Sequence, residues 1–337
     1  MNYIGMDIHK QFTVAVAKDE FGNKIIEEKF ENNKENIVKF LSVFHSNETK
    51  VVMESTCVWQ YIYDIIDEQG FETKLSNPGR TKAIACARMK TDSIDANTLA
   101  DLLRANLVAE SYVPNKDIRN LRDVVRQRKS LVKERTQIKN KIHACLNMHG
   151  IQLPFSTLCD KAIEWTFSEI EHTTFKTIIK VYINILEQFN AEINIIDDKM
   201  EQIALQDKQA NLLMTIPGIK STRALEIVSE IADISRFETS GKLCSYAGLV
   251  PSIRQSGNTL RFGRLVQQSS RSLKNALIEA SWNIVRVKEP NQLQVFYKKL
   301  CKKKSKQKAI CAVARKLCCI IFAMLKKQEE FKDFIIL

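Results

Sequence analysis

Short runs of strand-forming residues and amphipathic stretches of helical period follow one another through the first 110 residues. Runs rich in β-branched and aromatic residues, bounded by turn residues such as Gly22, predict strands, and apolar residues spaced three and four apart predict helices. Three strands followed by alternating helices and strands indicate an α/β domain with a mixed sheet. The expected strands are Tyr3–Ile8, Phe12–Ala17, Lys24–Phe30, Lys50–Glu54 and Phe71–Leu75, and the expected helices are Asn33–Phe44, Trp59–Gln69 and a stretch within Lys90–Ala100.

The apolar residues in the middle of the chain follow a different period. From Leu121 to Cys145 apolar residues recur in alternating steps of three and four, which predicts a long helix with a heptad seam. A second run of this kind, Tyr182–Ile203, is expected to be its antiparallel partner. Because Arg128 and Arg135 occupy seam positions, two interpretations stay open: a solvated coiled coil, or a seam for dimerisation with nucleic acid on the basic faces.

The last third of the chain is typical of a mainly helical domain. An apolar helix from Leu212, a turn at Pro217–Ile219 and a second helix starting near Ser221 predict a helical pair. This pair fits either a plain αα-hairpin or a helix-hairpin-helix element that offers turn amides to a phosphate, and Lys220 and Arg223 favour DNA. Further helices are expected over Leu273–Val287 and Gln307–Leu325, separated by the basic run Lys298–Lys308.

The composition narrows the class of partner. Lys and Arg number 51 against 39 Asp and Glu, and the net charge of +12 favours a polyanion such as nucleic acid. No apolar run approaches the roughly 20 residues of a membrane span and no leader is evident, so we expect a soluble, cytoplasmic protein without a membrane partner. The nine cysteines show no paired spacing and are expected to be small core residues. We expect three domains, at 1–110, 111–210 and 211–337.

Four carboxylates stand out in the α/β part. Asp92 and Asp95 lie three apart and share one helix face, where like charges repel unless a divalent cation lies between them. Asp7 lies between apolar neighbours in the first strand, and Glu54 closes the fourth. Each alone fits a solvated or element-end residue, but together they favour a site for Mg²⁺ or Mn²⁺. Two such ions could clamp the attacking and leaving oxygens of a phosphodiester.

The stretch 237–265 mixes glycine turns with Arg254, Arg261 and Arg264, and we expect a basic loop that binds phosphate. Ser256 lies within this loop. A serine hydroxyl is a weak nucleophile and needs a base, a metal or a cationic environment to attack phosphorus. From the residues alone, an inert loop serine is the commoner interpretation.

The motifs GMDIHK, MEST and KTDSIDANTLA, with YAGLVPSIRQSGN in the last third, resemble the DEDD-type transposases of bacterial insertion sequences. That group includes the Piv DNA invertases and the bridge-RNA-guided recombinases. The resemblance implies a RuvC-like, RNase H-like N-terminal domain whose four acidic residues bind Mg²⁺. It also implies that Ser256 attacks DNA and forms a covalent phosphoserine link, with Ser252 as the less favoured alternative. The residues that match the four acidic positions are Asp7, Glu54, Asp92 and Asp95.

The same resemblance implies an enzyme that cuts and rejoins DNA strands and is guided by an RNA encoded by its element. A homo-oligomer, dimer or tetramer, would then assemble the carboxylate site and Ser256 across subunits. Two other functions stay open. A metal-dependent, structure-specific endonuclease like a Holliday-junction resolvase would cleave DNA without a protein-linked intermediate. A non-enzymatic, nucleic-acid-binding coiled-coil protein would not depend on Asp7 or Asp92.

Overall fold

The computed structural model describes residues 1–85, 91–155, 158–257 and 259–332. The chain divides into two compact units, Met1–Val113 and Pro114–Leu337, each with its own apolar core. The expected division into three domains, with boundaries near residues 110 and 210, stays a prediction. Lys90 of the acidic stretch and Asn258 of the serine stretch lie outside the described residues.

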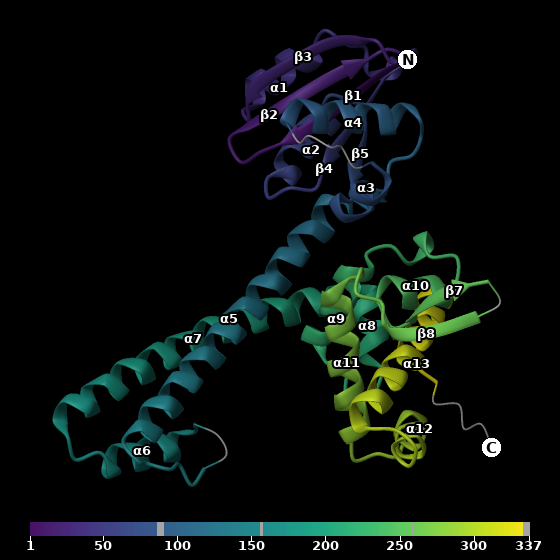
Figure 1. The fold of residues 1–337 in the computed structure, drawn as a ribbon. Helices are drawn as coiled ribbons and strands as arrows, with labels where there is room; N and C mark the ends of the chain where they lie inside the picture. Colours follow the sequence, from purple (N-terminus) through teal and green to yellow (C-terminus); the bar gives the residue numbers. More distant parts are fainter. Residues whose placement is uncertain (86–90, 156–157, 258, 333–337) are drawn as a thin grey trace. The chain divides into compact units, whose positions relative to one another are not determined.

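A six-stranded sheet forms the centre of the first unit (Figure 1). Its strand order is β3-β2-β1-β4-β5-β6; β1, β4 and β5 run parallel and the other neighbours antiparallel. The expected strands and the mixed sheet are confirmed, and this arrangement is consistent with an RNase H-like domain. The short β6 was not predicted because two residues are too few to show a period. The strands are β1 Asn2–Ile8, β2 Phe12–Lys18, β3 Lys24–Glu31, β4 Thr49–Glu54, β5 Glu72–Ser76 and β6 Glu110–Ser111.

Helices cover both faces of this sheet. α1 and α2 share an apolar core with side chains such as Met6 of β1, while α4 packs on the opposite face against β1, β2 and β4. Successive side chains of a strand point to opposite faces, so Asp7, next to Met6, lies on the α4 face. The helices are α1 Lys34–Leu41, α2 Trp59–Glu68, α3 Pro78–Ile84, which was not predicted, and α4 Asp92–Arg104.

α4 crosses β1 at Gly5, in direct backbone contact. A Cβ atom at this position would lie 2.1 Å from the carbonyl oxygen of Ala96 and 2.5 Å from the amide nitrogen of Ala100. Glycine permits a backbone approach that any side chain would block. The close crossing holds the first turn of α4, with its carboxylates, at the end of β1 where Asp7 lies.

Two long antiparallel helices, α5 and α7, lie side by side in the second unit (Figure 1). Arg128 of α5 bonds Asp197 of α7, and Arg135 bonds Asn190, so the numbering runs in opposite directions along the seam. The expected antiparallel partner is therefore present within the same chain. The coiled-coil description and dimerisation along this seam stay predictions. The helices of this part are α5 Lys116–Met148, α6 Asp160–Glu169 and α7 Thr173–Gln206.

The remaining helices of the second unit surround one apolar core. Leu225 of α9, Leu277 of α11 and Leu317 of α13 are buried in it. The turn Pro217–Ile219 separates α8 from α9, so the helical pair is confirmed, while the helix-hairpin-helix description stays a prediction. The basic run Lys298–Lys308 was expected to separate two helices, but α12 extends into it. The helices are α8 Lys208–Met214, α9 Ser221–Ile231, α10 Ser240–Tyr246, α11 Arg271–Arg286, α12 Gln292–Cys301 and α13 Lys306–Lys327.

The expected basic loop over 237–265 is wrong, because its first half contains the helix α10 and its second half forms a hairpin of two antiparallel strands. β7 covers Pro251–Ser256 and β8 covers Thr259–Leu265, so Ser256 ends a strand. Gly257 in the turn has a φ of +55°, which glycine adopts without strain. Arginines and glycines favoured a loop, although apolar and polar residues alternate on both sides of the turn. Among the described helices of either unit, none is long and apolar enough to cross a membrane.

Candidate metal centre and basic hairpin

Three potential metal ligands, Asp7, His9 and Asp92, meet at one end of β1. Nε2 of His9 lies 3.3 Å from Oδ2 of Asp7 and 3.2 Å from Oδ1 of Asp92. The three ligand atoms all lie within 4.8 Å of one another. Asp7 is only 8% exposed, whereas the other two side chains are partly open to solvent. Two carboxylate oxygens and one imidazole nitrogen at these separations could bind the same divalent cation.

The register of β1 and β4 places Glu54 beside Asp7. Met6 pairs with Met53 in this parallel pair, so the next position on each strand holds a carboxylate. Paired residues of neighbouring strands point to the same face. Val52, two residues before Glu54, packs on the α4 side with residues of that helix. Glu54 therefore lies at the same edge and on the same face as Asp7, although it is not one of the three clustered ligands.

The first turn of α4 supplies the other two predicted carboxylates. Thr91 caps the helix, with its Oγ1 accepting a hydrogen bond from the amide of Ile94 at 3.3 Å. Asp92 and Asp95 follow in the first turn, where the positive end of the helix dipole favours negative charge. The structure thus brings Asp92 directly to Asp7, and places Asp95 three residues further along, in the same first turn of the helix.

His9 was missed by the sequence reasoning, which treated it as part of a separator between two strands. The available signal was the short spacing of two metal-ligating residue types, since His9 lies two positions after Asp7 and directly follows the last residue of β1. Nε2 of His9 is buried and makes no hydrogen bond among the described residues, despite its two carboxylate neighbours. A buried donor atom without a hydrogen bond, next to two carboxylates, fits the binding of a divalent metal ion.

One face of the β7–β8 hairpin is basic. Arg254 pairs with Arg261 and Ser256 pairs with Thr259 across the strands, so the four side chains share one face. All four residues are exposed, and so is Arg264 further along β8. Like charges directly opposite each other destabilise an isolated hairpin, but they suit a polyanion.

The opposite face of the hairpin is apolar and equally exposed. Ile253 pairs with Phe262, and their exposed fractions are 60% and 65%.

Ser252, the alternative nucleophile, differs from Ser256 in its surroundings. Ser252 is half-buried. Its Oγ lies close to the backbone of β8, because a Cβ atom added at Gly263 would lie only 2.4 Å from it. The Ser256 hydroxyl is therefore the more accessible of the two.

The two predicted nucleic-acid contacts of α5 are already bonded within the chain. Nε and Nη2 of Arg128 both donate to the Asp197 carboxylate, which holds the pKa of the guanidinium above its usual value. Nη1 of Arg135 donates to Oδ1 of Asn190 at 3.2 Å. Contact of either arginine with nucleic acid would have to be shared with these bonds, and it stays a prediction.

The two predicted contacts at the start of α9 differ from each other. Lys220 is exposed just before the helix. Arg223 is largely buried and forms ion pairs with Glu226 and Glu279. Burial raises the pKa of the Glu226 carboxyl, even though Arg223 and Lys129 oppose that change. Lys220 is thus exposed to solvent and Arg223 is already paired with two carboxylates, and contact of either residue with nucleic acid stays a prediction.

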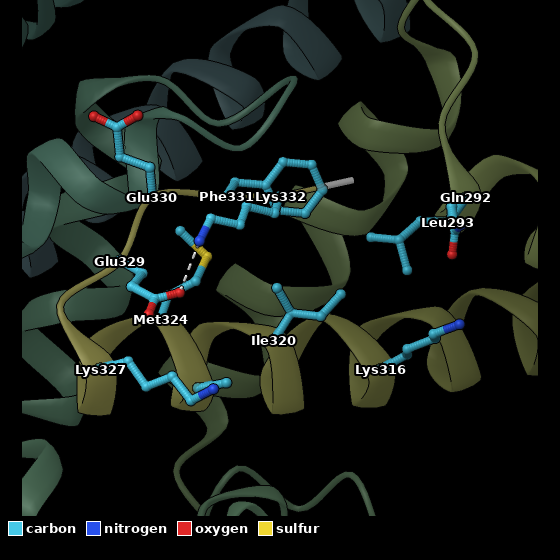
Figure 2. Close-up of a pocket in the computed structure, with 11 residues that line it drawn as sticks. Gln292, Leu293, Lys316, Ile320, Met324, Lys327, Glu329, Glu330, Phe331 and Lys332 are labelled. Carbon is cyan, nitrogen blue, oxygen red and sulfur yellow. Dashed lines mark hydrogen bonds and ion pairs between the residues drawn. The ribbon is translucent and has the colours of Figure 1, made fainter. Parts of the chain in front are cut away.

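A cavity of about 220 Å³ lies in the second unit, beside α13 (Figure 2). Ile320 and Met324 of α13 and Phe331 form its apolar walls. Lys332 and Glu329 form an ion pair of 3.1 Å at its edge. None of the predicted site residues that the structure describes lines this cavity.

Two family models match the chain. The IS110-type DEDD model, described as "Transposase", matches residues 4–150 and includes all four predicted carboxylates. The model described as "Transposase IS116/IS110/IS902 family" matches residues 210–298, which include Ser256.

Proteins of similar sequence include transposases and a gene-inverting protein. The transposase for insertion sequence element IS1111A of Coxiella burnetii is 24% identical, over 98% of this chain and 91% of its own length. The transposase for element IS1328 of Yersinia enterocolitica is 22% identical, over 82% of each chain. The pilin gene-inverting protein of Moraxella bovis is 33% identical, over 36% of this chain and 38% of its own.

Proposed function

The chain belongs to the IS110 family of DEDD transposases, and from this premise we propose that it cuts and rejoins DNA through a Mg²⁺-dependent carboxylate site and a serine nucleophile. The family establishes the enzyme class, a transposase or recombinase that acts on DNA. The observation that carries the proposal is the convergence of Asp7 and Asp92, from β1 and α4, around a common point.

Asp7, Glu54, Asp92 and Asp95 would hold the metal. When bound, Mg²⁺ or Mn²⁺ stabilises negative charge on the phosphate oxygens during displacement. The protein's own contribution is position: β1 and β4 present two carboxylates at one sheet edge, and the α4 dipole offsets part of the charge on the other two. The backbone contact at Gly5 fixes the distance between these two sources of ligands.

Ser256 would attack the phosphorus of the DNA backbone. Its Oγ forms a bond to phosphorus as the bond from phosphorus to the leaving deoxyribose oxygen breaks, and the serine proton is transferred in net terms to that oxygen, which leaves as a hydroxyl. Arg254 and Arg261 on the same face of the hairpin would stabilise the negative charge that develops on the phosphate. Rejoining is the reverse reaction with the hydroxyl of another strand. Ser256 is exposed whereas Ser252 is half-buried, and this difference supports the choice.

We further propose a guide RNA and a dimer or tetramer as parts of the working assembly. The support is the sequence resemblance, the net charge of +12 and the exposed arginines of the hairpin. Because Ser256 and the carboxylates belong to different compact units, an oligomer offers a way to bring the two chemistries together on one phosphate.

The test is a DNA cleavage assay with Mg²⁺ and the element's RNA, read on a denaturing gel for DNA attached to protein. Wild type and Ser252→Ala should form the adduct, and Ser256→Ala should not. Asp7→Asn should remove both cleavage and adduct. An adduct that persists in Ser256→Ala would refute the serine assignment, and cleavage by wild type without any adduct would establish a metal-dependent endonuclease instead.

A further inference from the structure

We propose that His9 is a direct ligand of the metal, through Nε2, and that the site is a mixed nitrogen–oxygen centre that prefers Mn²⁺ to Mg²⁺. The proposal rests on the metal site proposed above and deepens it. It adds a ligand outside the four carboxylates and a metal preference that four carboxylates alone would not produce.

The first support is the geometry around Nε2. This atom lies 3.3 Å from an Asp7 oxygen and 3.2 Å from an Asp92 oxygen, and it is buried. Both distances are within the range of an ion pair if the imidazole is protonated, yet neither contact is a hydrogen bond, and Nε2 has no other hydrogen-bond partner among the described residues. A buried polar atom that makes no hydrogen bond is costly, unless another partner binds it. A cation between the nitrogen and the two oxygens would bind all three.

The second support is that the position of His9 is fixed by its surroundings. Its amide donates to the carbonyl of Phe12 at 2.9 Å, and its carbonyl accepts from Nδ2 of Asn32 at 2.7 Å. The imidazole packs on the Phe12 ring, with centroids 4.6 Å apart. Nζ of Lys29 lies over the same Phe12 ring, 3.8 Å from its centroid. A side chain held at both backbone groups and at its ring is preorganised to bind a metal.

The metal preference follows from the donor set. Mg²⁺ strongly favours oxygen ligands, whereas Mn²⁺ and the later first-row ions also accept imidazole nitrogen. An imidazole ligand beside the carboxylates would therefore strengthen Mn²⁺ binding more than Mg²⁺ binding. His9 would act here as a specificity-determining ligand in addition to the carboxylates that hold the ion.

The test uses the full-length protein without a histidine tag, with Mn²⁺ as the probe. Pulsed electron paramagnetic resonance of bound Mn²⁺ detects a directly coordinated nitrogen, and calorimetry gives the affinities for Mn²⁺ and Mg²⁺. We expect a nitrogen signal in wild type that is lost in His9→Ala, with a loss of about tenfold or more in Mn²⁺ affinity and a smaller loss for Mg²⁺. The exposed His45 of the same unit provides the matched control, since His45→Ala should change nothing.

The outcomes separate this inference from the metal site on which it rests. Mn²⁺ bound to wild type without a nitrogen signal, or a signal that survives in His9→Ala, overturns the role of His9 and leaves the carboxylate site intact. Undiminished Mn²⁺ binding by Asp7→Asn would overturn the carboxylate site and the inference together. The measurement on wild type needs no variant, so a folding defect in His9→Ala cannot decide it.

Discussion

Replacing Gly5 with alanine tests how far the metal site depends on the crossing of α4 and β1. The new Cβ would lie 2.1 Å from the carbonyl oxygen of Ala96, where an ordinary contact needs 3.4 Å, so α4 must move by about 1.3 Å. Both nearest atoms belong to the backbone of α4, so no side-chain rotation relieves the clash. Overpacking of this kind costs about 1–3 kcal/mol of folding free energy. A shift of about 1 Å in a catalytic group lowers activity by about a hundredfold.

We expect Gly5→Ala to lose stability in urea unfolding and, in the fraction that stays folded, to bind Mn²⁺ more weakly and cleave DNA about a hundredfold more slowly. All four carboxylates are still present in this variant. Gly79→Ala is the matched control, because a Cβ at Gly79 meets only Oδ1 of Asn77, at an ordinary 3.6 Å. This control should bind metal and cleave DNA like wild type.

A Gly5→Ala protein with wild-type stability and wild-type metal affinity would refute the reasoning. It would mean that α4 can move away from β1 without separating Asp92 from Asp7. A loss of stability with unchanged affinity would show instead that the crossing serves folding alone.

Two further predictions concern charge. Removing Arg254 and Arg261 together should weaken DNA binding regardless of sequence and lower the slope of log affinity against log salt by about 0.9 for each lost phosphate contact. Ile253→Ser with Phe262→Ser, on the other face, should leave that slope unchanged, and an equal change in both variants would contradict the assignment of faces. Burial raises the pKa of Glu226 above the usual 4.5, so its contribution to stability is full below that pH and is lost as the pH rises through the folded-state pKa. Urea unfolding at a series of pH values should therefore show Glu226→Gln gaining on wild type as the pH rises, and parallel curves would contradict this.

Most of the first unit was predictable because its periods are strong. β1 and β2 are short, largely apolar runs that are buried almost throughout, and the apolar stripes of α1 and α2 mark the faces that these helices bury. Asp7 and Asp92 were selected correctly as neighbours because strand ends and helix starts meet at one edge of an α/β sheet. Their proximity is a property of topology, which the order of elements reveals.

The residues that were missed act through contacts that a single sequence does not display. Gly5 looks like any strand glycine until the backbone of α4 is placed against it. His9 looked like a turn residue because its role depends on Asp92, far away in the chain. The β7–β8 hairpin was missed because its arginines and glycines favoured a loop, and because its side chains are exposed, so the alternation of apolar and polar residues marked no buried face.

The polar bonds between α5 and α7 restrict how that pair of helices can move. A seam of apolar side chains alone would specify the register of the two helices only weakly. Arg128 and Asp197 specify it strictly, because they meet at one register only. A slip of one heptad, about 10 Å along the axis, would separate both Arg128 and Arg135 from their partners. Each partly buried charged group left without its hydrogen bonds would cost about 1–3 kcal/mol. These bonds therefore oppose sliding of α5 along α7. The pair should keep a constant length and move as one rigid unit.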